Sequence, residues 1–310
     1  MPNRIEEGRY QLAILFNLII KGNKEKYSSL CPPGFLQSQF HELLGYPLHF
    51  RRRDADIKDA VKAWCEDRTV AVEMYGNICD WDTSRVTDMS ELFVDRNKFN
   101  DDIRWWNVSS VTNMQYMFNS AEDFNQPLEN WNVSSVTNMM CMLRYATAFN
   151  QSLESWDVSS VTSMYGIFDS AEAFNQPLES WNVSSCTDMC EMFARAKIFN
   201  QSLESWDVSS VTSMQHMFCN ALAFNQPLES WDVSSCTNME LMFADTLWLD
   251  SGEDPDVSVF NQSLESWDVT SVTDMTGMFD GAYAFDQDID SWENWIGKDW
   301  SNESEDIFFC

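Results

Sequence analysis

The sequence predicts a repeat solenoid of the α/β class, a right-handed stack of short parallel strands and short helices with a helical N-terminal cap. Three observations predict it: one unit recurs along most of the chain, the unit is too short to bury its own apolar face, and its apolar spacing changes within each copy. The tryptophans mark nine units of 25 residues with one longer interval of 36: Trp81, Trp106, Trp131, Trp156, Trp181, Trp206, Trp231, Trp267 and Trp292.

Each unit divides into a strand-like part and a helix-like part. Leu128, Trp131 and Val133 follow the pattern L-x-x-W-x-V, which predicts a short strand with Trp and Val on one face. The apolar residues that follow are spaced three, three, one and three, which predicts a short helix with Ser135 as its N-cap. They are Val136, Met139, Met142, Leu143 and Ala146.

The chain divides into four regions. Residues 1–53 form an N-terminal helical segment, 54–77 a capping helix region, 78–292 the nine-unit solenoid, and 293–310 an acidic C-terminal tail or cap. The insertion 244–259 holds 11 extra residues between two units that otherwise stay in phase. We therefore expect the insertion to leave the stack as a loop, and insertions in solenoids often lie on the binding face.

The repeated run L-x-x-W-D-V-S-x-V-T-x-M-x-x-M-F-x-x-A-x-x-F-N resembles the BspA-type leucine-rich-repeat surface-protein family, in its Trp-Asp-Val branch of 25-residue repeats. The resemblance covers about residues 54–292. It implies a leucine-rich-repeat-like solenoid used for adhesion or protein binding, without catalysis, on the cell surface.

Charge is distributed unevenly along the chain. The formal net charge is −30; residues 1–80 hold 11 basic and 11 acidic side chains, and residues 81–310 hold 8 and 38. Because an array this acidic repels phosphate, nucleic acid is excluded as its partner. We expect a protein partner, which the charge suggests is basic, and a monomeric chain.

The candidate ligand-binding residues are carboxylates at two repeat positions, which we expect to form acidic ladders on the strand face. A solubilising role competes with this interpretation, because runs of charge are usually solvated faces. Trp248 in the insertion is a further candidate, as an anchor for a partner or as a cover for neighbouring units. The set is Glu129, Glu154, Asp157, Glu179, Glu204, Asp207, Glu229, Asp232, Trp248, Glu265 and Asp268.

Two other columns are expected to be structural. The tryptophans replace the core leucine of each strand, so we expect them to be buried rather than to bind sugars or bases. The asparagine series is expected to form a hydrogen-bonded stack that satisfies backbone groups in the turns. It comprises Asn100, Asn125, Asn150, Asn175, Asn200, Asn225 and Asn261, and Asp286 ends it.

The sequence indicates no enzyme, and neither a cofactor nor a metal is expected. It contains no phosphate loop, no H-E-x-x-H and no nucleophile elbow. The nine cysteines are scattered, and Cys186 with Cys190 has no second pair to complete a zinc site. A polysaccharide-active β-helix enzyme is an unfavoured alternative, because identical carboxylates in a ladder are not an acid/base pair with separate environments.

The N-terminal segment suggests a second function. "YQLAILFNLII" (10–20) is too short to span a membrane and lacks the cleavage site of a signal peptide, so no membrane insertion is expected. Residues 30–50 are similar to the start of an F-box. This similarity implies an alternative function, an intracellular adaptor or ubiquitin-ligase substrate receptor.

Localisation stays open at this stage. Seven Asn-x-Ser sequons occur, six of them in the repeats, where glycans would block the strand face or disrupt the turns. Together with the free cysteines, they favour an intracellular setting, whereas the family resemblance implies the cell surface. The preferred function is a non-enzymatic protein-binding or adhesion solenoid that presents an acidic strand face.

Overall fold

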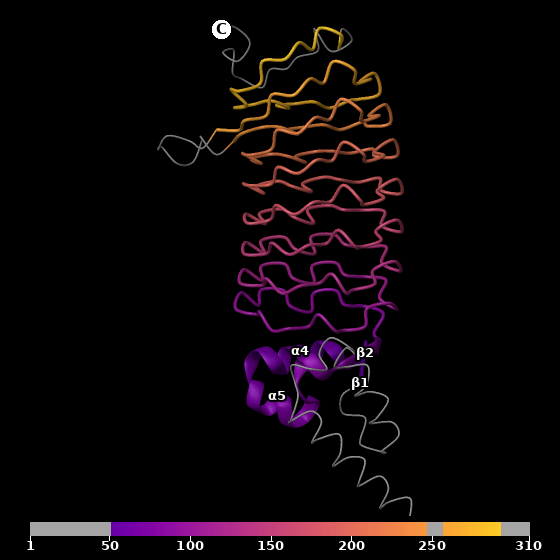
Figure 1. Cartoon of the computed structure of the whole chain (residues 1–310), viewed down its shortest axis with the longest axis vertical. Coiled ribbons are helices and arrows are strands. Elements are labelled where there is room, and N and C mark those ends of the chain that lie inside the picture. Colours follow the sequence, from indigo (N-terminus) through magenta and orange to yellow (C-terminus); the bar gives the residue numbers. More distant parts are fainter. Residues whose placement is uncertain (1–50, 247–256, 293–310) are drawn as a thin grey trace, which may run out of the picture.

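The computed structural model describes residues 51–246 and 257–292, and the repeats form a stack of flat coils along its long axis (Figure 1). At the N-terminal end lie strand β1 (Arg51–Arg53), helices α4 (Ile57–Glu66) and α5 (Arg68–Tyr75), a 3-10 turn (Ile78–Asp80) and strand β2 (Asp82–Arg85). Strand β1 pairs with β2 in parallel. Residues 1–50, 247–256 and 293–310 lie outside the described residues; they comprise most of the predicted N-terminal segment 1–53, most of the insertion 244–259 and the whole tail 293–310.

Successive coils pair through one parallel position per unit, from Asp88 with Asn113 to Asn238 with Asp274. In the coil that begins at Met164, the N–H groups of four alternate residues donate to carbonyls of the next coil at 2.8–3.0 Å: Met164, Gly166, Phe168 and Ser170. The N–H groups between them close turns inside their own coil, as in the 3.2 Å bond from Ile167 N to Met164 O. Each coil therefore uses alternate N–H groups for its own turns and for its neighbour.

This alternation is accompanied by left-handed backbone at two positions in most of the described coils. Gly166 has φ of 56° and Ser170 of 58°, and other coils place Cys141 and Tyr145 there with φ of 52° and 56°. A left-handed conformation is unfavourable for residues with a Cβ and worst for β-branched ones. None of the residues with positive φ is Val, Ile or Thr, which agrees with this constraint.

The predicted helices and strands of the repeats are wrong in the described residues. The stretch from Val136 to Ala146 contains turns and the pairing position Asn138 instead of a helix. The stretch from Leu128 to Val133 closes a turn, from Trp131 N to Leu128 O, instead of forming a strand. The apolar residues between Val136 and Ala146 have helical spacing. However, alternate N–H groups, which a helix would use internally, donate there to the next coil.

The L-x-x-W segments of successive coils are joined by side-chain hydrogen bonds rather than by backbone hydrogen bonds. The indole N–H of Trp156 donates to the carbonyl of Leu128 in the preceding coil at 3.0 Å, and Trp181 donates to Leu153 at 2.9 Å. Ser135 is not an N-cap, because its hydroxyl donates to the carbonyl of Ser109 in the preceding coil. The donors that a strand would supply from its backbone thus come here from indole and hydroxyl groups.

The tryptophans lie in the core, as expected from the sequence. Trp181 is 3% exposed, and its ring stacks on those of Trp156 and Trp206 with centroids 6.5 Å apart. A second column, of phenylalanines, runs parallel to it, with Phe174 stacked 6.0 Å from Phe199. Aromatic side chains bury large apolar areas, so these columns contribute to the hydrophobic stabilisation of the stack together with the buried Val, Met and Leu side chains.

The asparagine stack is also confirmed. The Asn175 side-chain oxygen accepts from the backbone N–H of Asn200 at 3.0 Å and from the Gln201 amide at 2.9 Å. The same pair of bonds recurs from Asn125 through Asn261. Each asparagine therefore satisfies a backbone donor one coil away.

The N-terminal end of the stack is closed by charged groups and helices. In the coils, the backbone N–H of a threonine such as Thr112 donates to the threonine carbonyl of the preceding coil. Thr87 has no preceding coil, and Asp54 accepts from its backbone N–H and its hydroxyl instead, both at 2.7 Å. Arg52 is 2% exposed, and its guanidinium lies 5.1 Å from the ring centroid of Tyr75 and 5.3 Å from that of Trp81. Cation–π contacts of this kind stabilise a desolvated guanidinium.

Replacing Trp181 by alanine is expected to destabilise the fold by about 3–5 kcal/mol, because it removes a buried indole from the middle of a ring column. Urea unfolding measures the change. As a control, Trp181→Phe keeps an aromatic ring and loses mainly the bond to Leu153, so about 1–3 kcal/mol is expected. A loss below about 1 kcal/mol for the alanine variant would contradict the assignment of Trp181 to the core.

Candidate binding surfaces

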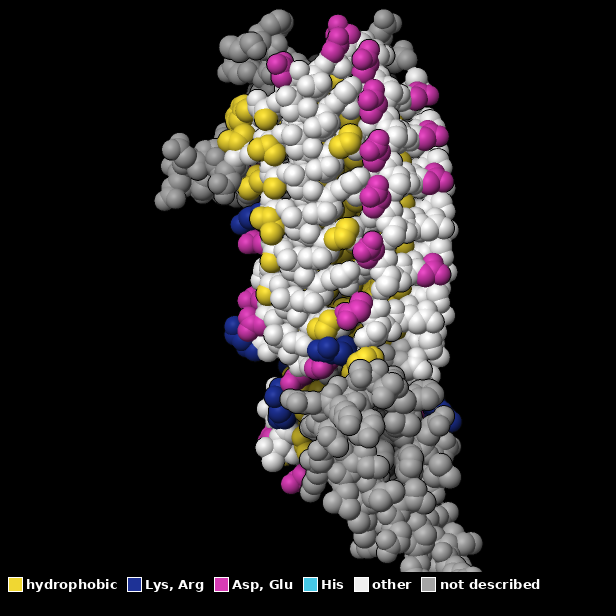
Figure 2. Space-filling model, viewed as in Figure 1, with side chains coloured by type: hydrophobic (Ala, Val, Ile, Leu, Met, Phe, Trp, Pro, Cys, Tyr) yellow, Lys and Arg dark blue, Asp and Glu magenta, His cyan; other side chains and the backbone are white. Residues whose placement is uncertain are grey.

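One edge of the stack carries the predicted carboxylates, and we call it the acidic edge. Its members are all exposed: Glu129, Glu154, Glu179, Glu204, Glu229 and Glu265, with Asp157, Asp207, Asp232 and Asp268. They lie on turns at the tips of the coils, because the expected strand face does not form there. Figure 2 shows two columns of acidic side chains that run parallel to the long axis on this side of the stack.

Each glutamate turn is fixed by the next coil. Glu154 is the second residue of a turn closed by the bond from Trp156 N to Leu153 O. The hydroxyl of Ser180 donates to the carbonyl of Glu154 at 2.7 Å, and Ser155 donates to Glu129 in the same way. The backbone of the glutamate column is therefore held at one coil spacing while the carboxylates extend into solvent.

The aspartates are positioned by their own turns. One carboxylate oxygen of Asp157 accepts from the hydroxyl of Ser159 at 2.6 Å and from its backbone N–H at 3.1 Å. These two hydrogen bonds, the hydroxyl first, lower the pKa of Asp157. The column is not uniformly charged, because Asn132 and Asn182 occupy the same position in the coils on either side of Asp157.

These carboxylates do not converge on one point. Within residues 51–246 and 257–292, no group of three or more His, Cys, Asp or Glu side chains is arranged to hold a metal ion. The acidic edge can attract a cationic partner through its summed field. Its glutamates repeat with the coil, and only the exchange of Asp for Asn at the second position distinguishes one coil from the next.

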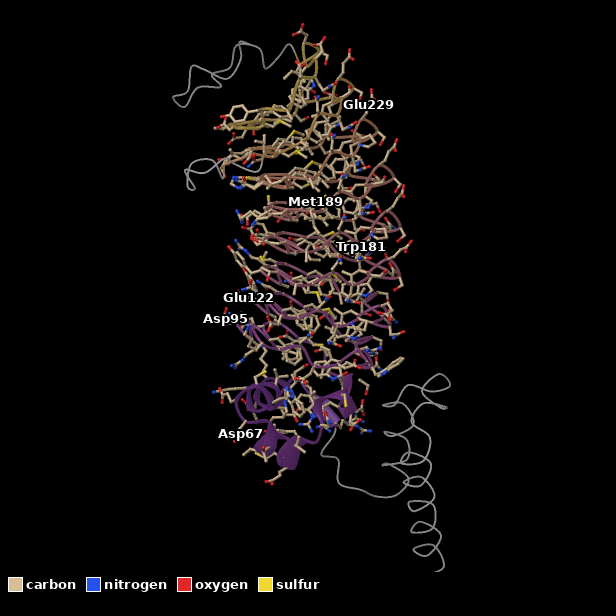
Figure 3. The ribbon with its side chains drawn as sticks, turned by 60° about the vertical axis from the view of Figure 1, so that its left-hand side comes forward. Asp67, Asp95, Glu122, Trp181, Met189 and Glu229 are labelled. Atoms are coloured by element: carbon tan, nitrogen blue, oxygen red, sulfur yellow. The ribbon has the colours of Figure 1, made fainter. Side chains whose placement is uncertain are left out.

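The opposite edge differs from coil to coil, and we call it the heterogeneous edge. It consists of the segment 13 to 17 residues after each unit tryptophan, for example 144–148 and 194–198. Figure 3 shows Asp95 and Glu122 on this side of the stack and Glu229 on the other. Between residues 105 and 292 the chain has only three basic residues, Arg144, Arg195 and Lys197, and all three belong to this edge.

A buried carboxylate organises the middle of the heterogeneous edge. Asp169 has no exposed side-chain surface, and its two oxygens lie 2.7 Å from Arg144 Nε and 2.7 Å from an Arg195 terminal nitrogen. Arg195 Nε also donates to the hydroxyl of Ser170 at 3.0 Å. A buried carboxylate needs partners of opposite charge, so Asp169 fixes both guanidinium groups at the surface.

Apolar side chains are exposed beside this cluster. Tyr145 is 40% exposed and packs on the Arg144 guanidinium, whose carbon lies 5.2 Å from the ring centroid, and Ile198 is 48% exposed. Among the described residues of the coils, every exposed large hydrophobic side chain lies on this edge. The others are Tyr283 and, once the 11 inserted residues are allowed for, Val257 and Val259. Figure 2 shows hydrophobic side chains along the left-hand side of the stack, where the heterogeneous edge lies.

The sequence-based prediction missed the heterogeneous edge, although the sequence contains a signal for it. The predicted sites came from positions that repeat, whereas the heterogeneous edge is made of positions that do not. The three isolated basic residues of an acidic array would have pointed to it. Trp248, the remaining predicted site residue, lies outside the described residues.

Three of the thiols in the coils are buried, and their burial favours the protonated form. Cys190, Cys186 and Cys236 are buried in the core. Burial raises the pKa of Cys190 to about 12 and those of Cys186 and Cys236 to about 11. Each is therefore a protonated thiol at pH 7, and it is the thiolate that reacts.

A model of the family described as "Mycoplasma protein of unknown function, DUF285" matches residues 65–177, 151–252 and 255–302. A search of the curated proteins found no match, and a search of the solved structures found none either. Across the two described stretches of the chain, no helix has the length and apolar character needed to cross a bilayer.

Replacing Asp157 by asparagine is expected to remove a pH-dependent part of the stability. Because the folded pKa of Asp157 is lowered, its carboxylate stabilises the fold above the unfolded value of about 3.9, and this contribution is lost as the pH falls through the folded pKa. Urea unfolding of the wild type and of Asp157→Asn should therefore differ more at pH 6 than in strong acid.

The matched control is Glu154→Gln, which removes one negative charge from the same edge without touching the Ser159 hydrogen bonds. Its difference from the wild type reports the general effect of charge. If both variants show the same pH dependence, the hydrogen bonds to Asp157 do not contribute as stated.

Proposed function

The chain belongs to the DUF285 family, and we propose that it is a non-enzymatic protein-binding scaffold whose two edges have different roles. The acidic edge attracts a basic partner, and the heterogeneous edge selects it. One observation carries the proposal: the exposed large apolar side chains of the described coils, and the basic residues of the array between 105 and 292, lie together on one edge.

The chemistry of the heterogeneous edge supports protein recognition. Tyr and Arg are enriched at protein interfaces, and Tyr145 stacks on Arg144 there. Asp169 holds Arg144 and Arg195 in place, so a partner that contacts them does not have to order two long side chains. Glu172 pairs with Lys197 at 3.0 Å, which keeps the region close to neutral on a strongly acidic chain.

The two edges differ in what they can specify. Carboxylates that recur with each coil attract a cationic surface but do not define where along the stack it stops. Such long-range attraction mainly raises the rate of association and weakens with salt. Side chains that occur once, such as Tyr145 and Ile198, define a single position along the stack.

The absence of catalysis is part of the proposal. The buried, protonated thiols and the solvated, hydrogen-bonded carboxylates support it. We also retain as a proposal that the family is a branch of the BspA-type leucine-rich-repeat solenoids used in adhesion. The repeated L-x-x-W-D-V-S run supports this, while the turn-based coils depart from the alternating strands and helices that the resemblance implies.

Site-specific photo-cross-linking tests the proposal. The full chain carries a photoreactive phenylalanine at position 145 in one variant and at position 204 in another, and each is irradiated in cell extract. Both positions are expected to capture the same protein at low salt. At about 1 M salt, where the Debye length is about 3 Å, capture from position 204 should disappear and capture from position 145 should persist.

The captured protein is then measured against variants by surface plasmon resonance. The double change Tyr145→Ser with Ile198→Ser is expected to weaken binding about tenfold or more, through faster dissociation. Val72→Ser removes an exposed apolar side chain of helix α5, which lies outside both edges, and serves as the control. If neither position captures a protein, or if only position 204 does, the assignment of specificity to the heterogeneous edge is wrong.

A further inference from the structure

Helix α5 presents an apolar face that the described residues leave uncovered. Val70 is 45% exposed and Met74 is 54% exposed, and they lie one turn apart on the same flank of the helix. Val72 is also 45% exposed, but it lies on the opposite flank. Only Ala71 of this helix is fully buried, whereas α4 buries Ile57, Ala60, Val61 and Trp64.

The position of α5 makes this exposure unusual. The helix lies at the end of the coil stack, beyond the first coil (Figure 1). The ends of repeat arrays need a cap with a polar outer surface, because no further unit covers them. An uncovered Val70–Met74 flank leaves the cap incomplete.

We propose that residues 10–20 of this chain bind the Val70–Met74 flank of α5. This segment, YQLAILFNLII, is the most continuous apolar run in the 50 residues that precede β1. It has only two polar side chains, Gln11 and Asn17. Covering the flank removes apolar surface of both from water, which is the dominant favourable term in such an association.

The covalent connection favours this occupant over a separate molecule. Strand β1 follows the N-terminal segment directly, and its Arg52 lies 5.1 Å from the ring centroid of Tyr75 at the end of α5. Thirty residues separate positions 20 and 51, and a random coil of that length has an end-to-end distance of about 30 Å, compared with about 12 Å for the length of helix α5. The segment therefore acts at a high effective concentration, whereas a second copy would bring another net charge of −30.

The inference does not depend on the proposed roles of the two edges, because α5 belongs to neither.

Oxidation of Met74 by hydrogen peroxide tests the proposal in the full chain, with the sulfoxide quantified by mass spectrometry. Leu15→Asp, which places a charge in the apolar run, is expected to raise the oxidation rate of Met74 about threefold or more, since exposed methionines oxidise fastest. Asn17→Asp adds the same charge at a polar position and should leave the rate unchanged. Met189, which is fully buried, should stay unoxidised in every folded sample.

A second measurement uses the chain without a disruptive change. A photoreactive phenylalanine at position 15 is expected to cross-link within the same molecule to the peptide that contains Val70 and Met74. Equal Met74 rates in both aspartate variants, or cross-links from position 15 only to other peptides, would overturn the proposal. A Met74 rate that falls as protein concentration rises would overturn it in favour of a second copy.

Discussion

The fold depends on the alternating use of backbone N–H groups, which bind in turn within a coil and to the next coil. In the coil from Met164 to Ser170, four N–H groups bind the coil above, and the N–H groups of the residues between them close turns. A coil on its own would leave half of these donors without a partner in the protein. The array therefore folds as a stack, and any change in the length of a coil must be accommodated outside it, as the regular pairing of Asn238 with Asp274 across the insertion shows.

This dependence explains which features could be predicted from the sequence. Burial of the tryptophans and the asparagine stack follow from repetition and side-chain chemistry, and both are found. The local conformation was predicted wrongly, because a spacing of three and four residues indicates a helix only when N–H groups bond within the segment. Here Cys141 and Tyr145 adopt left-handed backbone, which residues with a Cβ seldom do. In the described coils glycine occupies these positions only at Gly166, Gly277 and Gly281, so glycine does not signal the conformation in most units.

The candidate surface was harder to predict than the core for a related reason. Repetition reveals positions where every unit needs the same side chain, and those needs are mostly structural. Arg144, Asp169 and Arg195 occupy three different units and two different repeat positions, so their contact appears only when coils are stacked. The sequence does show that Arg144 and Arg195 are isolated basic residues within a long acidic array.

Stacking also explains why the two edges can diverge. The interior and the turn tips are constrained by bonds that recur at every coil, such as Ser180 to the carbonyl of Glu154. On the heterogeneous edge, residues such as Tyr145 and Ile198 direct their side chains away from the repeating bonds, so they can vary without affecting the coils above and below. A stack that is regular inside can thus carry an irregular surface, and the irregular surface is the one able to distinguish one partner from another.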